Sequence, residues 1–555
     1  MIGDCHRAAL PSPLNRLRPA PAAWHRLLCT VLAASLAAGA APPLWAQATP
    51  PSPVRLPSLG ESASDEFNLS QEKRLGEQIM REIRRDPAYL DDPELLDYAQ
   101  ALWQPLVQAA RRNGNIGADT ERLFPYELFL VRDRSVNAFA LPGGYVGLHL
   151  GLMAITNTPD ELVSVLGHEL SHVTQRHIAR SISASSRTSS LSLAAMLLGL
   201  LVASRAGSVD AAQAAVVGGQ AAMMQAQLNF SRDMEREADR TGQALMTDAG
   251  YAPAGMPAMF DKLDASSRLN DSGNFPYLRS HPLTVDRIGE ARQRVEASGA
   301  PGTLPPPPLL HSLMQGRARV LMDPSVQSLR RLQEFDIRGG QAELPAADRL
   351  AALYTGALAS ALLRDFARAQ RAIDVAQSML AAPALQDAAA RRAFSRLSLQ
   401  VALARGDMAG ATAALQAGAV GDGSRTGLLL QADWALAEGS EAALRRSAEA
   451  LLTWVAERRG DALAWQLLSQ TAARQGQQLR AVRAEAEAQA ALGNLDGAIE
   501  RLRAGQRLAR QGGAGTDFID ASVIDARLRD LLAQRRQLMA DERRGSDRRS
   551  DDPPQ

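Results

Sequence analysis

One stretch of the 555-residue chain, from Glu161 to Arg180, limits most strongly what this protein can be. It reads ELVSVLGHELSHVTQRHIAR, has the spacing of a buried helix, and carries His168, Glu169 and His172 at its centre. Because residues four apart lie above one another on a helix, His168 and His172 can hold one metal ion. Glu169 lies further round the helix, where a carboxylate can act on water without binding the ion. The alternative is a helix with two unrelated histidines, but the chain has only 8 histidines, which favours a metal site.

The length and the composition predict a globular protein with more than one domain. A chain of 555 residues exceeds the size at which a single hydrophobic core stops growing. Hydrophobic residues make up 46% of the chain and charged residues 22%, which is ordinary for soluble proteins. The formal net charge is only +1, so we expect no nucleic-acid partner. Peripheral association with a membrane stays open.

Residues 1–48 have the pattern of a secretory signal peptide. A basic stretch is followed by the uncharged run from Leu27 to Ala41 and by small residues at Ala46 and Ala48. The apolar run is too short to favour a permanent membrane span, so cleavage after Ala46 or Ala48 is expected. Both cysteines lie in this segment, so a mature chain would have no thiol to bind a metal. We therefore expect a periplasmic protein whose mature chain has no transmembrane span.

Changes in composition divide the rest of the chain. The proline-rich run APGTLPPPP at residues 300–308 is the clearest boundary, and few contacts are expected to cross it, so that residues 1–305 would form a separable unit. The polar stretch from Asp541 is expected to be disordered. The predicted segments are a signal peptide (1–48), a linker (49–68), the metal-site domain (69–299), a proline-rich linker and connecting helix (300–345), a helical repeat domain (346–540) and a disordered tail (541–555).

A short phrase recurs within the Ala-rich segment 346–540: a small polar turn, an apolar residue and an Ala three positions later. It begins at Arg364, Gly406 and Gly493, and a weaker version begins at Gly439. Gly406 and Gly439 are 33 residues apart, close to the period of about 34 residues of tetratricopeptide helix pairs. The other spacings are irregular. We therefore predict an all-α domain of degenerate tetratricopeptide-like repeats, with plain helical hairpins as the alternative.

The metal-site domain is predicted to be α+β, mostly helical with a small sheet. Residues 136–148 read as two strands joined at Pro142-Gly143-Gly144, and they form either an ordinary core hairpin or a strand edge for an extended peptide. The apolar run from Leu191 to Ala203 reads as a buried helix or as a mobile hairpin over the site. Further helices are expected at 69–85, 93–112, 225–242 and from Pro282, and a strand at 124–131.

A third metal ligand is needed, because a catalytic zinc usually has three protein ligands and one open position. Without cysteines it must be His, Asp or Glu, and Glu235, on a predicted helix, is the best candidate. Three phrases, HELSHVTQRHIAR, SRDMEREAD and SHPLTVDRI, together resemble the zinc peptidase family of CAAX prenyl proteases and HtpX heat-shock proteases. They cover residues 168–288. The order of signal peptide, peptidase and helical repeats resembles the soluble periplasmic branch of that family.

The resemblance implies a zincin-like metallopeptidase fold with one Zn²⁺ per chain. It assigns His168, His172 and Glu235 as the ligands and Glu169 as the general base. Asp239, one helical turn after Glu235, matches a residue that would hold a ligand histidine in the correct tautomer.

The resemblance leaves the role of His281 open. This residue matches a histidine that faces the metal, either occupying the open position at rest or stabilising the oxyanion of the reaction. His177 is needed for neither task and is interpreted as a histidine of the helix surface.

The resemblance also implies a function, the hydrolysis of peptide bonds in misfolded or stalled outer-membrane proteins. The repeats would contact the outer-membrane assembly machinery and give chaperone-like support. A different class of function stays open, in which the chain is a non-proteolytic chaperone or assembly scaffold that acts through its helical repeats.

Overall fold

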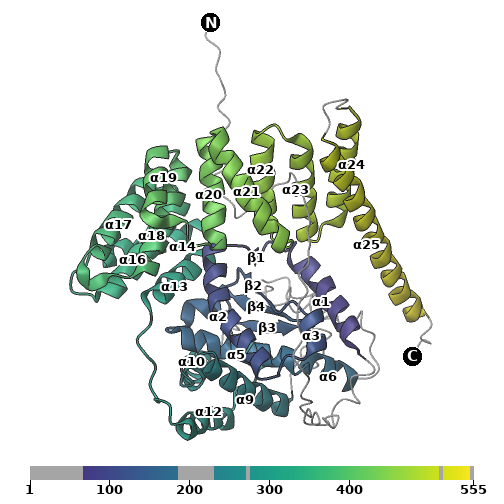
Figure 1. Ribbon diagram of the computed structural model, residues 1–555. Coiled ribbons are helices and arrows are strands. Elements are labelled where there is room, and N and C mark those ends of the chain that lie inside the picture. The colour runs from purple at the N-terminus through teal and green to yellow at the C-terminus, as the bar shows by residue number, and fades with distance from the viewer. Residues whose placement is uncertain (1–66, 185–230, 270–274, 512–516, 551–555) are drawn as a thin grey trace, which may run out of the picture.

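The computed structural model describes residues 67–184, 231–269, 275–511 and 517–550. The predicted signal peptide and the apolar run from Leu191 to Ala203 lie outside these residues. Within the described ranges most residues are helical, and the strands form one small sheet (Figure 1). This confirms the predicted α+β domain followed by a helical C-terminal region. None of the helices in the described ranges combines the length and the apolar character needed to cross a membrane.

Four strands form one mixed sheet in the order β1-β2-β4-β3. β1 pairs antiparallel with β2, β2 parallel with β4, and β4 antiparallel with β3. The hairpin between β3 and β4 turns at Gly143 and Gly144, whose φ angles of 78° and 93° favour glycine. The two strands predicted around this turn are thus confirmed. The bounds are Tyr89–Leu90 for β1, Glu127–Val131 for β2, Ala138–Leu141 for β3 and Tyr145–His149 for β4.

The two faces of the sheet belong to two hydrophobic clusters, because successive side chains of a strand point to opposite faces. Leu128 and Leu130 of β2 pack on the side of helices α2 (Pro93–Arg112) and α5 (Pro159–Thr174). Phe129 and Val131 pack on the other side with helix α1 (Leu69–Ile83). Helix α5, which carries the metal motif, therefore lies against one face of the sheet.

Helix α9 (Arg232–Asp248) packs along α5 and brings a second set of polar residues to the motif. The two helices cross at Gly167 and Gly242, where a Cβ atom on Gly242 would lie 2.8 Å from the backbone nitrogen of His168. No larger residue fits this crossing without a backbone shift. The other helices of this part are α3 (Ala118–Leu123), α4 (Leu150–Ile155), α6 (His177–Ala184), α10 (Gly255–Leu269), α11 (Tyr277–Ser280) and α12 (Val285–Ser298).

Several predicted helix bounds are wrong, among them those of the helix expected at 225–242, because α9 begins only at Arg232 and continues to Asp248. The single helix expected from Glu161 to Arg180 is two helices, because α5 ends at Thr174 and α6 begins at His177. Arg176, between them, has a left-handed φ of 53° that a continuous helix excludes. Helix α12 begins at Val285 and not at Pro282, since the side chain of Thr284 caps it by accepting a hydrogen bond from the Arg287 amide.

Antiparallel helices continue from residue 309 and form an arc along one side of the sheet domain (Figure 1). The last helix continues to Ser550, past Asp541, where the sequence predicts a disordered tail. The α-helices are α13 (Leu309–Leu321), α14 (Val326–Gln333), α15 (Phe335–Gly339), α16 (Ala346–Leu362), α17 (Phe366–Leu380), α18 (Ala388–Arg405), α19 (Met408–Ala414), α20 (Arg425–Glu438), α21 (Glu441–Glu457), α22 (Ala462–Arg474), α23 (Gln478–Ala491), α24 (Leu495–Gln511) and α25 (Phe518–Ser550).

The recurring phrase of the sequence marks the turns of these helix pairs. Gly406, Gly439 and Gly493 have φ angles of 75°, 80° and 76°, and Arg364 has 62°. A left-handed residue ends one helix and lets the chain reverse into the next, which is why glycine recurs there. The repeats are thus turns of helical hairpins, and their tetratricopeptide ancestry stays a prediction.

The proline-rich linker does not isolate the two parts, contrary to the expectation of few contacts across it. One hydrophobic cluster has members on both sides of the linker, from Leu90 to Val401. In addition, the acidic start of α2 pairs with residues of the C-terminal helices. These pairs are Asp91–Arg425 (2.6 Å), Asp92–Arg317 (2.7 Å), Glu94–Arg396 (3.1 Å) and Asp97–Thr426 (2.6 Å).

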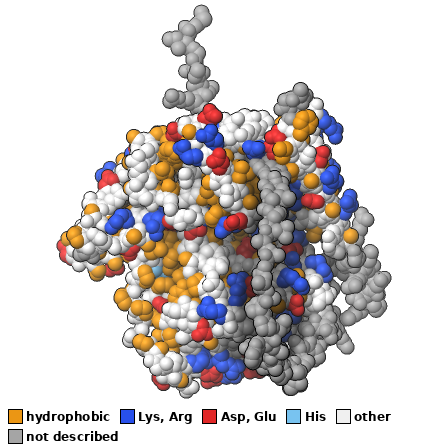
Figure 2. All heavy atoms as spheres, in the orientation of Figure 1, with side chains coloured by type: hydrophobic (Ala, Val, Ile, Leu, Met, Phe, Trp, Pro, Cys, Tyr) orange, Lys and Arg blue, Asp and Glu red, His pale blue; other side chains and the backbone are white. Residues whose placement is uncertain are grey.

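On the face shown in Figure 2, acidic and basic side chains lie interspersed over both the sheet domain and the helical repeats. This mixture follows from the composition, since Lys and Arg total 61 and Asp and Glu total 60. Charges of opposite sign that alternate over a surface largely cancel at a distance.

Candidate metal centre

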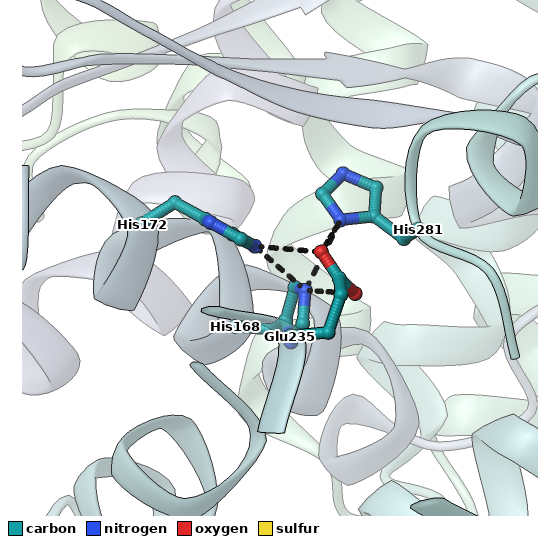
Figure 3. Close-up of side chains that lie close together, drawn as sticks. All are labelled: His168, His172, Glu235 and His281. Atoms are coloured by element: carbon teal, nitrogen blue, oxygen red, sulfur yellow. Dashed lines mark hydrogen bonds and ion pairs between the residues drawn. The ribbon is translucent and has the colours of Figure 1, made fainter. Parts of the chain in front are cut away.

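Four polar side chains from three segments meet in the interior, beneath the sheet. His168 and His172 project from α5, Glu235 from α9, and His281 follows α11 (Figure 3). Each offers one ligand atom, and these atoms all lie within 4.8 Å of one another. All four residues are buried. The structure therefore brings together the two histidines of the motif, the candidate third ligand and the histidine expected to face the metal.

The separations between these atoms fit one metal ion. The Nε2 atoms of His168 and His172 lie 3.0 Å apart, and His172 Nε2 lies 3.4 Å from Glu235 Oε1. His281 Nδ1 lies 3.0 Å from the same oxygen and 3.3 Å from His168 Nε2. A tetrahedron with metal–ligand bonds of about 2.0–2.1 Å has edges of about 3.3 Å. Imidazole nitrogens with one carboxylate are also a donor set that zinc prefers.

Glu169 stands beside this group without joining it. Its side chain is 0% exposed, and neither carboxylate oxygen accepts a hydrogen bond from the described residues. His281 is close to it, with Nε2 3.5 Å from Glu169 Oε1. A buried carboxylate with open acceptor positions costs free energy unless a ligand meets it. Glu169 is therefore a candidate to bind a ligand beside the four grouped side chains.

Asp239 and Arg287 connect two of the proposed ligands. Asp239 Oδ1 lies 2.9 Å from His168 Nδ1, the nitrogen that faces away from the group. Arg287 donates from Nε and Nη2 to both oxygens of Asp239, at 2.6 and 2.8 Å, and its Nη1 lies 2.8 Å from Glu235 Oε2. Burial alone would raise the pKa of Asp239, but the hydrogen bonds from Arg287 and His168 lower it to about 2.

The buried charges of the site call for a cation. With Glu169, Glu235 and Asp239 ionised and the histidines neutral, as metal ligands must be, the buried residues hold three negative charges against the single positive charge of Arg287. A divalent ion would balance them. Burial alone would lower the pKa of His168, but its hydrogen bonds to Asp239 and Glu235 raise it to about 10. Metal binding at His168 would therefore displace a proton.

His177 is not a histidine of the helix surface, so this prediction is wrong. The turn at Arg176 brings His177 back toward α5, where it is 0% exposed and its Nδ1 lies 2.8 Å from His172 Nδ1. Its Nε2 lies 3.2 Å from Glu237 Oε2 on α9. Burial and the nearby Arg180 lower the pKa of His177 to about 4. A helical wheel could not find this contact, because it assumes one unbroken helix.

Tyr277 and Arg287 are the other residues that sequence reasoning missed. The ring of Tyr277 stacks on His281 with centroids 4.7 Å apart and an interplanar angle of 29°. The Tyr277 amide also donates to the carbonyl of Val136, just before β3, over 3.4 Å. Arg287 donates from Nη1 to the carbonyl of Pro282 at 2.8 Å, so both residues fix the segment that carries His281. Neither contact has a periodic signal in the sequence.

A helix bearing H-E-x-x-H against a small mixed sheet, with a glutamate from a second helix beside it, defines a zincin-like metallopeptidase domain. Residues 102–295 match the sequence model of peptidase family M48. The resemblance inferred from the three phrases is thereby confirmed. M48 peptidases are metal-dependent, and the buried group described above is consistent with a metal.

Three relatives show what the chain is similar to. A Vibrio cholerae protein is 38% identical over 242 residues, which are 44% of this chain and 48% of that protein. The beta-barrel assembly-enhancing protease of Escherichia coli strain K12 is 33% identical over 267 residues, 48% of this chain and 52% of the relative. Metalloprotease LoiP of the same bacterium is 29% identical over 244 residues, 44% and 88% of the two chains. The match spans about half the length of the first two relatives.

Proposed function

We propose that this chain is a zinc-dependent metalloendopeptidase with one Zn²⁺ per chain. The observation that carries the proposal is the buried group of His168, His172 and Glu235. Beside it lies the carboxylate of Glu169, which accepts no hydrogen bond from the residues that the structure describes. The donor set, the spacing of its atoms and the two excess negative charges all suit a divalent ion. In this proposal the three residues hold the ion and Glu169 does not.

The chemistry of the proposed reaction is peptide hydrolysis. Bound zinc would supply Lewis acidity, which polarises a peptide carbonyl and lowers the pKa of water. Glu169 Oε1 or Oε2 takes a proton from the attacking water and later delivers it to the nitrogen of the leaving amine. Asp239 accepts from His168 Nδ1–H, which leaves His168 Nε2 with a free lone pair toward the ion.

Strand β3 is the proposed docking edge for the peptide. It is the last strand of the sheet, pairs only with β4 among the described strands, and lies against α5. An extended peptide can add to such an edge through main-chain hydrogen bonds, which require no particular sequence. Only unfolded segments can pair in this way, so the proposed substrates are misfolded or stalled proteins.

The place of action is proposed from the sequence and from the relatives. The N-terminal pattern is that of a signal peptide. One of the relatives above, the Escherichia coli protein, is named a beta-barrel assembly-enhancing protease, which supports a periplasmic setting. We therefore assign outer-membrane proteins as the substrates and the assembly machinery as the partner of the helical repeats. The repeats would supply chaperone-like support.

His281 is proposed to restrain the enzyme at rest. Its Nδ1 faces the three proposed ligands, at the fourth corner of the group, where the reaction needs water. A neutral imidazole there is a good zinc ligand and would exclude that water. The competing role, stabilisation of an oxyanion, requires His281 to move away from this corner before it acts.

One observation favours a second function, a non-proteolytic chaperone or scaffold. With His281 at the fourth corner, four protein groups surround the proposed ion, and such a closed set is typical of structural zinc.

Glu169→Gln separates the two functions. For a peptidase it should keep the zinc and abolish cleavage of an unfolded substrate, and it should not replace the wild type in a deletion strain. Full rescue of the deletion by Glu169→Gln would support the scaffold, and cleavage near the wild-type rate would refute the role of Glu169.

A further inference from the structure

The two metal-facing histidines of α5 have different partners behind them. His168 is backed by the carboxylate of Asp239 at 2.9 Å. His172 is backed by another imidazole, because its Nδ1 lies 2.8 Å from His177 Nδ1. His177 continues to Glu237 through Nε2 at 3.2 Å, and Arg180 Nη1 lies 3.0 Å from the same Glu237 oxygen. A chain of polar groups thus leads from His172 to the partly exposed side chain of Glu237.

We propose that His177 and Glu237 are positioning residues that fix the metal-binding tautomer of His172. The inference rests on the proposed function only in taking His172 Nε2 as a metal ligand. A ligand nitrogen must present its lone pair, so the proton of neutral His172 lies on Nδ1. This Nδ1–H donates to His177 Nδ1, which places the His177 proton on Nε2. The Nε2–H group of His177 then donates to Glu237, so each nitrogen in this series of hydrogen bonds has a defined role as donor or acceptor.

The backbone is built to make this contact. In an unbroken helix a residue five positions after His172 would point to a different side. The left-handed φ of 53° at Arg176 breaks the helix and turns His177 back toward His172. Such a conformation costs about 1–3 kcal/mol for a residue other than glycine, so other contacts must hold it. Arg176 Nε lies 2.8 Å from the buried Glu72 of α1, and its Nη2 donates to the Phe67 carbonyl at 2.9 Å.

The proposed series of hydrogen bonds from His172 through His177 to Glu237 also connects α5 with α9. Glu237 lies two residues after Glu235 on α9, so it points to another side of that helix than the proposed ligand does. The same helix thereby supports both histidines, His168 through Asp239 and His172 through Glu237 and His177. Changes in this outer layer should weaken zinc binding without removing a ligand.

The test uses the purified full chain and Zn²⁺ alone, measured by competition with a chromophoric chelator. His177→Phe keeps a ring but removes the acceptor, and we expect zinc affinity to fall by about 10–100-fold. His177→Asn should recover most of the loss, because its Oδ1 can take the place of the His177 Nδ1 acceptor. Glu237→Gln should give a smaller decrease than His177→Phe. The control is His311→Gln, a buried histidine that contacts Tyr98 and the Thr156 carbonyl.

A second readout separates positioning from packing. The visible spectrum of the Co²⁺-loaded chain should change in His177→Phe and return toward wild type in His177→Asn, whereas His311→Gln should leave it unchanged. Zinc affinity within threefold of wild type in His177→Phe, or an equal loss in His311→Gln, would overturn the inference. A wild-type chain that binds no Zn²⁺ would overturn the proposed function together with it, whereas failure of the variants alone leaves the proposed function standing.

Discussion

At the scale of single residues, the buried site is a balance of charge and hydrogen bonding. Asp239 and Glu235 share one guanidinium, that of Arg287, which also binds the carbonyl of Pro282 next to His281. The Arg287 side chain therefore orients the proposed ligand Glu235, the carboxylate of Asp239 that supports His168, and the segment that carries His281. An arginine suits this place because its planar fork donates to several acceptors at once.

The identity of the third ligand can be tested directly. In Glu235→Ala the only carboxylate of the group is lost, so zinc should be absent after gel filtration. Asp239→Asn keeps every ligand atom and should lower zinc affinity by about 10–100-fold. Zinc per chain and chelator competition measure both effects. One tightly bound zinc in Glu235→Ala would contradict the proposed ligand set.

The two candidate roles of His281 predict opposite effects of His281→Ala on the rate of substrate cleavage. If His281 restrains the enzyme, His281→Ala should cleave an unfolded substrate faster than wild type, because the fourth corner is then open to water. If it stabilises an oxyanion, turnover should fall by about 10²-fold. Zinc content has to be equal in both chains for the comparison, since His281 Nδ1 also contacts Glu235. We expect the increase, and a decrease at constant zinc content would exclude the restraint.

At the scale of elements, local signals in the sequence were sufficient where a local interaction decides the structure. Helix α2 was predicted at 93–112 from its helical pattern, and the structure shows that Asp92 caps it and Pro93 occupies its first turn, which needs no distant partner. The break at Arg176 could not be predicted, since it depends on Glu72, more than a hundred residues away in the chain. The H-E-x-x-H motif identified the site, but the residues behind it come from contacts between helices.

The crossing of α5 and α9 predicts a sharp effect of a small change. A Cβ atom in Gly242→Ala would lie 2.8 Å from His168 N and 2.9 Å from Gly167 C, so the backbones must separate. We expect a loss of about 1–3 kcal/mol in the free energy of unfolding and weaker zinc binding. Gly289→Ala on α12 is the control, because nothing lies within 4 Å of its new Cβ atom and helix propensity favours alanine. Equal denaturation midpoints for the two variants would contradict this account of the crossing.

At the scale of the whole molecule, the helical repeats are part of the structure that supports the peptidase part. The acidic start of α2 is neutralised by arginines from α13, α18 and α20, and α2 in turn packs on both α5 and α9. The sequence does not show which distant residue a charged side chain pairs with, so the proline-rich linker suggested two independent units. Glu94 and Arg396 are each less than a tenth exposed, and removing one partner of such a pair is costly.

The resulting prediction reverses the expectation of a separable peptidase unit. A fragment of residues 67–305 should aggregate or fail to unfold cooperatively, because it lacks α13 to α18, which complete the hydrophobic cluster that ends at Val401. It would also leave Asp92 and Glu94 without Arg317 and Arg396. A fragment of residues 67–421 keeps that cluster and both arginines, so it should be a soluble monomer that melts below the full chain. Light scattering after gel filtration and thermal unfolding distinguish the two. A monomeric, zinc-binding 67–305 fragment with a cooperative transition would show that the repeats only cover a domain that is stable by itself.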